Sequence, residues 1–380
     1  MNKNSNNNPL VTVIISAYNH EKYIGHTINS ILNQTLKDFK IIIIDDFSQD
    51  DTYNVALSFS KNNNKITVYR NKENLGPSAN LNKAISISNS KYISLIASDD
   101  IMKEDKLEKQ CSFLDINMNY SAVFSKIETI DENNNSIRHP SEKLFNKKYE
   151  SSNKILNYFF YNGNFINACT VTIRRSSLES VLPYKNTSLQ LQDFDIWIRL
   201  LLKRKEIFCL EEKLVQYRIC NNLSEIGVEN GSFEMRSRMI FEYRDVLRNY
   251  LKINNLEYFK SIFPDFRYAN EHIDKRLIKF YIAIESYKVF KQNNFIPYYI
   301  FAYETLTEIM NDDKLRLLAN KKHNFKMSDF FKIANNNPVL KNNISNQSLE
   351  IKATTKKKSF IKKFKKSILK RLSKAKCIKL

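Results

Sequence analysis

The first hundred residues alternate short apolar runs with segments whose apolar residues recur at helical spacing. The apolar runs are rich in β-branched residues, which is typical of strands buried on both faces of a parallel sheet. After the first run, Ile24, Ile28 and Ile31 share one face of a helix. Strands and helices that alternate in this way predict an α/β fold with a mostly parallel central sheet and right-handed crossovers. The predicted strands are residues 11–16, 41–44, 66–69 and 92–97.

Three of these four strands end in polar side chains. In an open α/β sheet, ligands bind just beyond the carboxyl ends of the strands. Carboxylates there suit Mg²⁺ or Mn²⁺, which prefer oxygen ligands and share them with substrate phosphates. Capping of the next helix is the alternative for the last pair, but it does not explain carboxylates at the ends of two strands. The edge therefore predicts a site for a nucleotide and a metal ion, formed by Tyr18, Asn19, Asp45, Asp46, Asp99 and Asp100.

Composition excludes several other kinds of site. The chain has five glycines, and their positions form neither G-x-G-x-x-G nor a P-loop, so a nucleotide must be held without a glycine-rich cradle. The five cysteines are scattered and odd in number, which indicates a reducing compartment and argues against a disulfide framework. The five histidines show no zinc-ligand spacing.

Five short motifs, in order, resemble those of a known family. They are S-A-Y-N at 16–19, S-I-L-N-Q-T at 30–35, D-D-F-S-Q-D at 45–50, N-L-G at 74–76 continuing to Asn80, and S-D-D at 98–100. Over about residues 9–225, the chain resembles the family 2 inverting glycosyltransferases, which have the GT-A fold. The resemblance implies transfer of a sugar from a UDP- or dTDP-sugar to a glycan or lipid-linked acceptor in bacterial surface-polysaccharide biosynthesis.

The resemblance also implies which residues bind the nucleotide. Ala17, Tyr18 and Asn19 would line the nucleoside pocket, and Asp46 would hydrogen-bond to the base. Asn80, in the motif that begins at Asn74, would belong to the same donor-binding set.

For the metal, the resemblance implies Asp99 as the ligand of the D-x-D motif. It would hold Mn²⁺ or Mg²⁺ against the diphosphate of the donor, with Asp100 beside it on the ribose or donor sugar. Ala97 stands where the fuller D-x-D-D form has its first acid, which leaves fewer carboxylates around the cation.

A second helix signal lies in the predicted acceptor half. Apolar residues at helical spacing from 194 to 201 predict an amphipathic helix with Asp193 at its start. The resemblance implies that Asp193 is the general base, and it can also cap the helix, because a fixed carboxylate is well oriented to take a proton. Asp195 is the alternative base, although it is well spaced for an i, i+4 ion pair with Arg199.

Two further stretches belong to this half. Residues 217–224 resemble the Y-R-x-H-x-x-N-x-S loop of the family, with Cys220 in place of the histidine, and Arg218 remains available to meet phosphate. The aromatic residues at 159–165 form either a sugar-facing wall or ordinary core packing.

Beyond the resemblance, the chain changes character twice. From about residue 231 the apolar pattern turns helical, which predicts an extension that packs on the catalytic domain or forms a dimer contact. The net charge of +20 is uneven, since thirteen basic and no acidic residues follow Glu350, which leaves +7 for the first 350 residues. We expect a disordered N-terminus (1–8), a GT-A catalytic domain (9–230) with nucleotide-binding (9–105) and acceptor (106–230) halves, a helical extension (231–340) and a basic amphipathic tail (341–380).

The tail places Phe360, Phe364, Ile368 and Leu372 four residues apart among lysines. A basic amphipathic helix at 356–379 suits an anionic membrane surface, and a solvated, disordered tail is the alternative. Nucleic acid is not an expected partner, since no reader motif is present. With no signal peptide and no apolar stretch of ~18 to 20 residues, we expect a cytoplasmic protein, peripheral on the cytoplasmic face of the inner membrane.

Two other functions stay open on the sequence. A sugar nucleotidyltransferase also combines paired acids with an α/β nucleotide fold, but it would normally carry a glycine-rich phosphate loop near the N-terminus. The other is a catalytically inactive GT-A domain that serves as a membrane scaffold. The presence of Asp46, Asp99, Asp100 and Asp193 argues against it.

Overall fold

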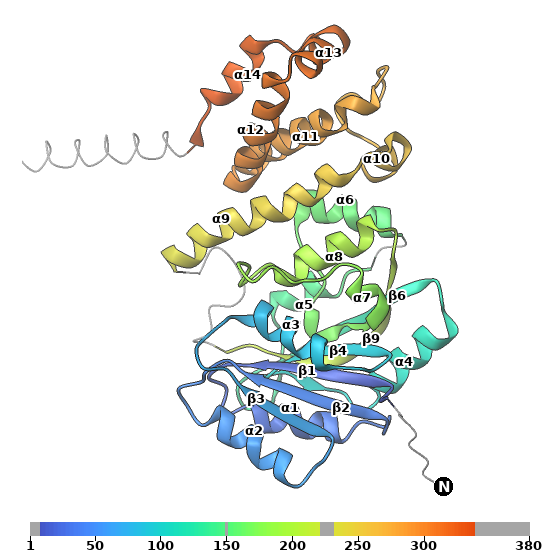
Figure 1. Cartoon of the computed structure of the whole chain (residues 1–380), viewed down its shortest axis with the longest axis vertical. Coiled ribbons are helices and arrows are strands. Elements are labelled where there is room, and N and C mark those ends of the chain that lie inside the picture. The colour runs from blue at the N-terminus through green and yellow to red at the C-terminus, as the bar shows by residue number, and fades with distance from the viewer. Residues whose placement is uncertain (1–7, 149–150, 221–231, 339–380) are drawn as a thin grey trace, which may run out of the picture. The chain divides into compact units, whose positions relative to one another are not determined.

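The computed structural model describes residues 8–148, 151–220 and 232–338, and Figure 1 shows its helices and strands. The expected N-terminal disorder at 1–7 and the predicted basic helix at 356–379 lie outside the described residues. By its internal contacts the chain divides into two compact units, Met1–Ile282 and Ala283–Leu380. The first unit contains the sheet and all the residues predicted to form the site.

The half of the catalytic domain that was expected to bind the nucleotide, residues 9–105, has the predicted parallel sheet. β1 (Val11–Ala17), β2 (Phe39–Asp45), β3 (Ile66–Arg70) and β4 (Tyr92–Ala97) pair in parallel in the order β3-β2-β1-β4. Ala17 lies opposite Asp45 at the carboxyl ends of β1 and β2. The polar residues that follow β1, β2 and β4 therefore meet at one edge, as predicted.

The rest of the sheet is mixed, so the expectation of a mostly parallel sheet holds for the first half and not for the second. The order continues β4-β8-β6-β9-β5, with β7 paired to β6. β8 is antiparallel to β4 and β6, β9 is parallel to β6, and β5 is antiparallel to β9. Antiparallel neighbours need no crossover helix. These strands are β5 (Ile101–Met102), β6 (Tyr120–Ile130), β7 (Ser136–Ile137), β8 (Thr172–Arg174) and β9 (Glu206–Arg218).

Helices cover both faces of the parallel part of the sheet. α1 packs against α2 and β5, while α3 contacts β1 and β2 on the other face (Figure 1). The predicted apolar face of α1 is confirmed, since Ile24, Ile28 and Ile31 are fully buried. These helices are α1 (Ile24–Leu32), α2 (Thr52–Lys61), α3 (Pro77–Ile87) and α4 (Lys106–Ile116).

The half that was expected to bind the acceptor, residues 106–230, carries an aromatic core. Phe159, Phe160 and Phe165 are fully buried and pack edge-on or tilted against other rings, such as Phe194 and Phe263. Core packing is therefore the correct interpretation of these rings. The helices are α5 (Pro140–Phe145), α6 (Ser152–Asn162), α7 (Arg175–Glu179), α8 (Gln192–Leu202), α9 (Phe233–Leu247) and α10 (Leu256–Ile262), with 3₁₀ turns η1 (Ala168–Thr170), η2 (Arg248–Lys252) and η3 (Lys275–Leu277).

Two of these helices extend the first unit past residue 230. α9 contacts α8 and η2, and α10 contacts α6, so both pack on the acceptor half and belong to the unit that ends at Ile282. α11 (Ile278–Asn293) starts at the end of this unit, and the second unit continues with α12 (Ile296–Asn311), α13 (Asp313–His323) and α14 (Met327–Ala334). None of the helices that the structure describes is long and apolar enough to cross a membrane.

Candidate active site

A cavity of about 340 Å³ opens beyond the carboxyl end of β4. Two of the predicted site residues, Asp99 and Asp193, lie on its wall. Elements far apart in the sequence therefore bring a candidate metal ligand and a candidate base to one space. Asn164 and Asn167 add polar groups to this wall, and Met235 and Met239 of α9 close one side of it.

Asp193 stands in the first turn of α8. Leu191 occupies the N-cap position, so Asp193 is not the N-cap that the sequence allowed. Its Oδ1 accepts a hydrogen bond from the backbone N–H of Phe194 at 2.6 Å, and its Oδ2 accepts one from Nδ2 of Asn164 at 3.2 Å. Burial raises the pKa of Asp193 to about 6, against the lowering by these two donors. A carboxylate with a pKa near the working pH is suited to general-base catalysis.

Asp99 is 5% exposed and lies two residues after the end of β4. Burial raises its pKa, while the nearby His20 and Arg218 act in the opposite direction. Nδ1 of His20 lies 3.9 Å from Oδ1 of Asp99 and 2.7 Å from Oγ of Ser98. Sequence reasoning missed His20, although its position right after the S-A-Y-N motif at the same edge was a usable signal.

The donor set for a metal ion is small. Within the part of the chain that the structure describes, no three His, Cys, Asp or Glu side chains gather as a metal site. A cation that bridges a diphosphate takes one or two carboxylates and completes its shell with phosphate oxygens and water. The buried Asp99 carboxylate fits that requirement, with His20 beside it.

Asp100 faces the protein interior. It is 1% exposed, and its Oδ1 accepts a hydrogen bond from the backbone N–H of Arg218 at 2.9 Å. Burial, together with the charge of Asp100 and a hydrogen bond to it, raises the pKa of the Cys169 thiol well above its ordinary value. The predicted contact of Asp100 with the ribose or donor sugar would have to compete with these partners.

Asp46 and Asn80 hold the loop at 74–76. Oδ1 of Asp46 accepts hydrogen bonds from Asn71 Nδ2 and the N–H of Leu75, and its Oδ2 accepts one from the N–H of Gly76, at 2.8 to 2.9 Å. The same Asn71 nitrogen donates to Oδ1 of Asn80 at 2.7 Å. Both carboxylate oxygens of Asp46 are therefore engaged by the protein, and a bond from Asp46 to the base stays a prediction.

Asp45, the residue before it, was predicted to lie at this edge but was given no role of its own. It is fully buried, and its Oδ2 lies 3.3 Å from Nε of Arg70 and accepts from the N–H of Ser48. Its Oδ1 has no hydrogen-bond partner among the described residues. The Arg70 guanidinium lies over the Tyr53 ring, 5.0 Å from its centroid. This buried oxygen could meet a ligand only if the side chains that cover it moved aside.

The S-A-Y-N motif turns the chain after β1. Ala17 is buried, whereas Tyr18 is 44% exposed. Asn19 has a left-handed backbone conformation (φ 54°) and ties the ends of β1 and β2 together. Its Oδ1 accepts from the N–H of Gln49 at 2.8 Å, and its N–H donates to Oγ of Ser48 at 3.1 Å.

Arg218, predicted to meet phosphate, is 3% exposed. Its guanidinium donates to the backbone oxygens of Asp99 and Asp131 and to Oδ1 of Asn134, at 2.6 to 2.8 Å. A phosphate contact by Arg218 would have to share these donors. Burial raises the pKa of the nearby Cys220, which favours the thiol over the thiolate form.

Asp195 is the base that the sequence ranked second. It is 2% exposed, forms the predicted ion pair with Arg199 at 2.8 Å, and pairs with Lys185 at 2.7 Å. Its Oδ1 also accepts from Nδ2 of Asn249 at 2.8 Å. These contacts make Asp195 a structural residue that joins α8 to neighbouring segments.

Glu242 of α9 is a functional candidate that sequence reasoning missed. Its buried carboxylate accepts hydrogen bonds from Oγ of Ser188 and from the backbone N–H groups of Leu189, Gln190 and Leu191, at 2.9 to 3.0 Å. The loop 188–191 leads directly into the first turn of α8, where the candidate base stands. Glu242 therefore fixes the entry to that helix.

The curled α/β sheet, with two carboxylates on one cavity beyond its strand ends, defines a protein of the GT-A class. Residues 12–182 match the model of the family described as Glycosyl transferase family 2. The chain is 30% identical to an uncharacterized glycosyltransferase of Methanocaldococcus jannaschii over 261 residues. This alignment covers 67% of this chain and 86% of that protein. The chain belongs to glycosyl transferase family 2 and is a transferase.

Two further proteins extend the comparison. The glycosyltransferase TuaG of Bacillus subtilis, named for teichuronic acid biosynthesis, is 29% identical over 275 residues, which are 71% of this chain and 98% of TuaG. The crystal structure of S. aureus TarS 1–349 in complex with UDP-GlcNAc shares the fold, with a TM-score of 0.50 at 18% identity, over 66% of this chain and 70% of that chain.

Proposed function

We propose that the protein transfers a sugar from a UDP- or dTDP-sugar to a hydroxyl group of a glycan or lipid-linked acceptor, with inversion at the anomeric carbon. The observation that carries this proposal is the shared cavity, whose wall holds both Asp99 and Asp193. A donor bound with its diphosphate at Asp99 would present its sugar to the space beside Asp193.

In this mechanism Asp193 takes the proton of the acceptor hydroxyl as the oxygen attacks the anomeric carbon. The bond to the diphosphate breaks in the same displacement, which inverts the anomeric centre. Asn164 fixes the carboxylate through its hydrogen bond to Oδ2. Asp99 would hold a divalent cation, Mn²⁺ or Mg²⁺, which stabilises negative charge on the departing diphosphate when bound.

For the nucleoside, the geometry favours Asp45 over Asp46. A uracil or thymine base offers an N–H donor, and Asp45 keeps a buried oxygen without a hydrogen-bond partner among the described residues, next to the cationic Arg70. Both oxygens of Asp46 already accept hydrogen bonds, from Asn71 and from the loop at 74–76. Ala17, Tyr18 and Asn19 would form the adjoining wall.

The comparisons support the donor class and the setting. TarS was crystallised with UDP-GlcNAc, and TuaG is named for the biosynthesis of a cell-surface polymer. We place this protein in bacterial surface-polysaccharide biosynthesis, at the cytoplasmic face of the inner membrane. Its residues 356–379 would bind anionic lipid there.

Thermal shift and transfer assays on two variants test the proposal. A ligand that binds only the native state at 100 times its Kd stabilises by ~2.7 kcal/mol, which is visible as a rise in Tm. We expect UDP or dTDP with Mn²⁺ to raise the Tm of the wild type. Asp99→Asn should lose this shift, and Asp193→Asn should keep the shift and lose transfer. Asp105→Asn, an exposed member of an i, i+4 pair with Lys109, is the matched control.

The alternatives predict other results. If Asp193→Asn retained the wild-type transfer rate, the assignment of the base would be wrong. If no nucleotide shifted the Tm at any metal concentration, the inactive-scaffold reading would replace ours. Pyrophosphate release from a nucleoside triphosphate and a sugar 1-phosphate would identify a nucleotidyltransferase instead.

A further inference from the structure

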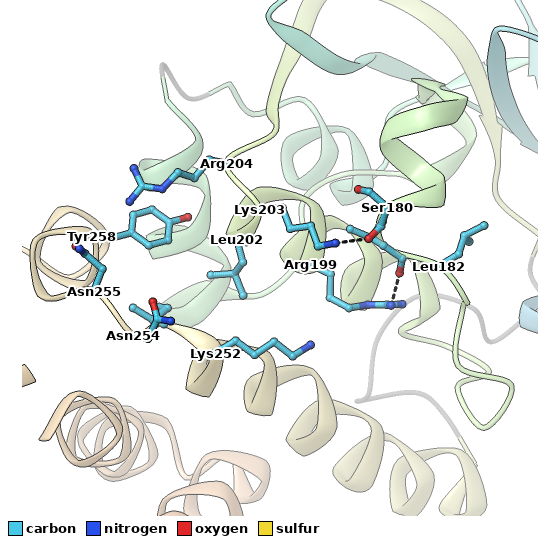
Figure 2. A pocket seen from close by; sticks show the side chains of 12 residues that line it. Ser180, Leu182, Arg199, Leu202, Lys203, Arg204, Lys252, Asn254, Asn255 and Tyr258 are labelled. Carbon is cyan, nitrogen blue, oxygen red and sulfur yellow. Dashed lines mark hydrogen bonds between the residues drawn. The ribbon is translucent and has the colours of Figure 1, made fainter. Parts of the chain in front are cut away.

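A second cavity, of about 480 Å³, lies away from the one just described and shares no lining residue with it. Figure 2 shows it between three segments of the first unit. These are residues 180–182 after α7, the end of α8 at 199–204, and residues 252–258, which join η2 to α10. Nothing in the proposed transfer reaction uses this cavity.

The lining of this cavity is strongly basic. It includes Arg199, Lys203, Arg204 and Lys252, and no Asp or Glu. Asn254 is one of the neutral polar residues in the lining. The Tyr258 ring lies at one end of the cavity, and the Arg204 guanidinium lies over it, 4.1 Å from the ring centroid. Four like charges around one space repel each other unless an anion lies between them.

Uncharged oxygens hold three of the four cationic side chains in place, although Arg199 also has a charged partner. Arg199 donates to the backbone oxygens of Val181 and Pro183, and Lys203 donates to that of Ser180. Figure 2 marks the bond from Lys203 to Ser180 and one bond from Arg199 by dashed lines. Nζ of Lys252 donates to an amide oxygen at 2.9 Å. Carbonyl oxygens fix the side chains but cancel no charge, so the cavity keeps its positive potential.

One carboxylate lies behind the cavity wall. Asp195 pairs with Arg199, whose side chain is 14% exposed, and it also pairs with Lys185. A single negative charge is thus shared by two cations. Burial lowers the pKa of Lys252, and Arg199, Lys185 and Lys203 lower it further, while Asp195 acts in the opposite direction. The net field at Lys252 is positive.

We propose that this cavity binds a phosphate monoester or diester, with Lys203 and Lys252 as the cationic contacts. The volume exceeds that of a phosphate group alone and leaves room for the sugar or glycerol that it esterifies. Such a group occurs on phosphorylated glycans and in the headgroups of anionic phospholipids. In either case the ligand binds outside the cavity that holds Asp99 and Asp193.

Isothermal titration of the full-length protein with glycerol 1-phosphate tests the proposal for a soluble ligand. We expect the double variant Lys203→Gln/Lys252→Gln to lose affinity by about tenfold for each charged contact removed. The matched control is Lys260→Gln, a lysine of α10 that does not line the cavity and pairs with Glu257. Asp193→Asn should bind glycerol 1-phosphate like the wild type, which separates this site from the transfer site.

Flotation with vesicles distinguishes the two sources of the ligand. If phosphatidylglycerol vesicles bind the wild type more tightly than the double variant, and phosphatidylcholine vesicles bind neither, the ligand is a lipid headgroup. If only glycerol 1-phosphate binding falls in the double variant, the ligand is a soluble phosphate ester. Because the basic tail is present in every variant, it cannot account for the difference.

The proposal is overturned if the double variant matches the wild type and Lys260→Gln in both assays. Misfolding does not obscure this result, since removal of repelling charges should leave the Tm unchanged or higher. The nucleotide-induced Tm shift, measured on the same samples, reports on the donor site independently. A failed transfer proposal therefore remains distinguishable from a failed phosphate site.

Discussion

Glu242 offers the sharpest test of how the acceptor half is held together. The perturbation is Glu242→Ala, which removes the acceptor of three consecutive backbone N–H groups and of the Ser188 hydroxyl. An unsatisfied buried donor costs about 1–3 kcal/mol. Leu189 is 38% exposed and the next two residues are half-buried, so water can reach part of the loop. We therefore take the lower end of the range, about 1 kcal/mol, for each of the three N–H groups. We expect a loss of about 3 kcal/mol in the free energy of unfolding.

Glu242→Gln should cost less, about 1–2 kcal/mol, because a neutral acceptor forms hydrogen bonds roughly half as strong as a carboxylate. The amide oxygen can still serve the donors now on Oε2, while the amide nitrogen opposes the N–H of Leu189. Since a domain of this size loses about 2–4 °C of Tm per kcal/mol, thermal unfolding resolves both variants. The control is Glu234→Gln, an exposed position in the first turn of the same helix.

A role in positioning predicts more than a lower Tm. Because the loop 188–191 leads into the turn that carries Asp193, Glu242→Gln should lower kcat for transfer more than it raises KM for the donor, measured well below its Tm. A variant that unfolds within about 1 °C of the wild type, with unchanged kcat, would refute the reasoning. A lower Tm with unchanged kcat would leave Glu242 a structural residue alone.

Further predictions follow from the site. Transfer should rise with pH through about 6, because Asp193 must lose its proton to act as a base, and a pH profile of kcat checks this. Since burial disfavours the charged form, Asp193→Asn should gain Tm over the wild type at pH 8; the gain should shrink as the pH falls below about 6 and vanish only below the ordinary carboxyl pKa of 3.8. Gly76→Ala should lower the Tm, since Gly76 has φ 80° and a Cβ there would lie 2.6 Å from Leu189. Asp45→Asn should weaken UDP binding about tenfold with a small change in Tm, and Asp46→Asn should mainly lower the Tm.

The sequence predicted what is encoded locally. The β-branched runs identified β1 to β4, and the carboxylates after β2 and β4 identified the edge where the cavity lies. The three-residue β8 is too short to show a period, so the mixed half of the sheet could not be read in the same way. The sequence could not show which of Asp45 and Asp46 has a carboxylate oxygen left for the nucleoside base. That depends on which of the two side chains meets the loop at 74–76, and so on tertiary packing.

Long-range contacts explain the other omissions. Asn164 meets Asp193 across 29 positions, and Glu242 meets the loop 188–191 across more than 50. Contacts over such separations follow no helical or strand period in the sequence. Asn164 and Glu242 therefore look like ordinary polar residues of a loop and a helix. The basic cavity depends in the same way on three segments that only the fold brings together.

The hydrogen bonds that Glu242 accepts from the loop 188–191 also limit how segments of this protein can be exchanged with those of its relatives. The region that matches the family model ends at residue 182, before both Asp193 and Glu242. A chimera joined at the end of β9 would take Asp193 and the loop 188–191 from one parent and α9 from the other, so the loop would keep its contacts only if the second parent also supplied an acceptor in place of Glu242. A junction placed after Ile282 keeps Asp193, the loop 188–191 and α9 from a single parent, so that the first unit is exchanged as a whole with all its predicted site residues.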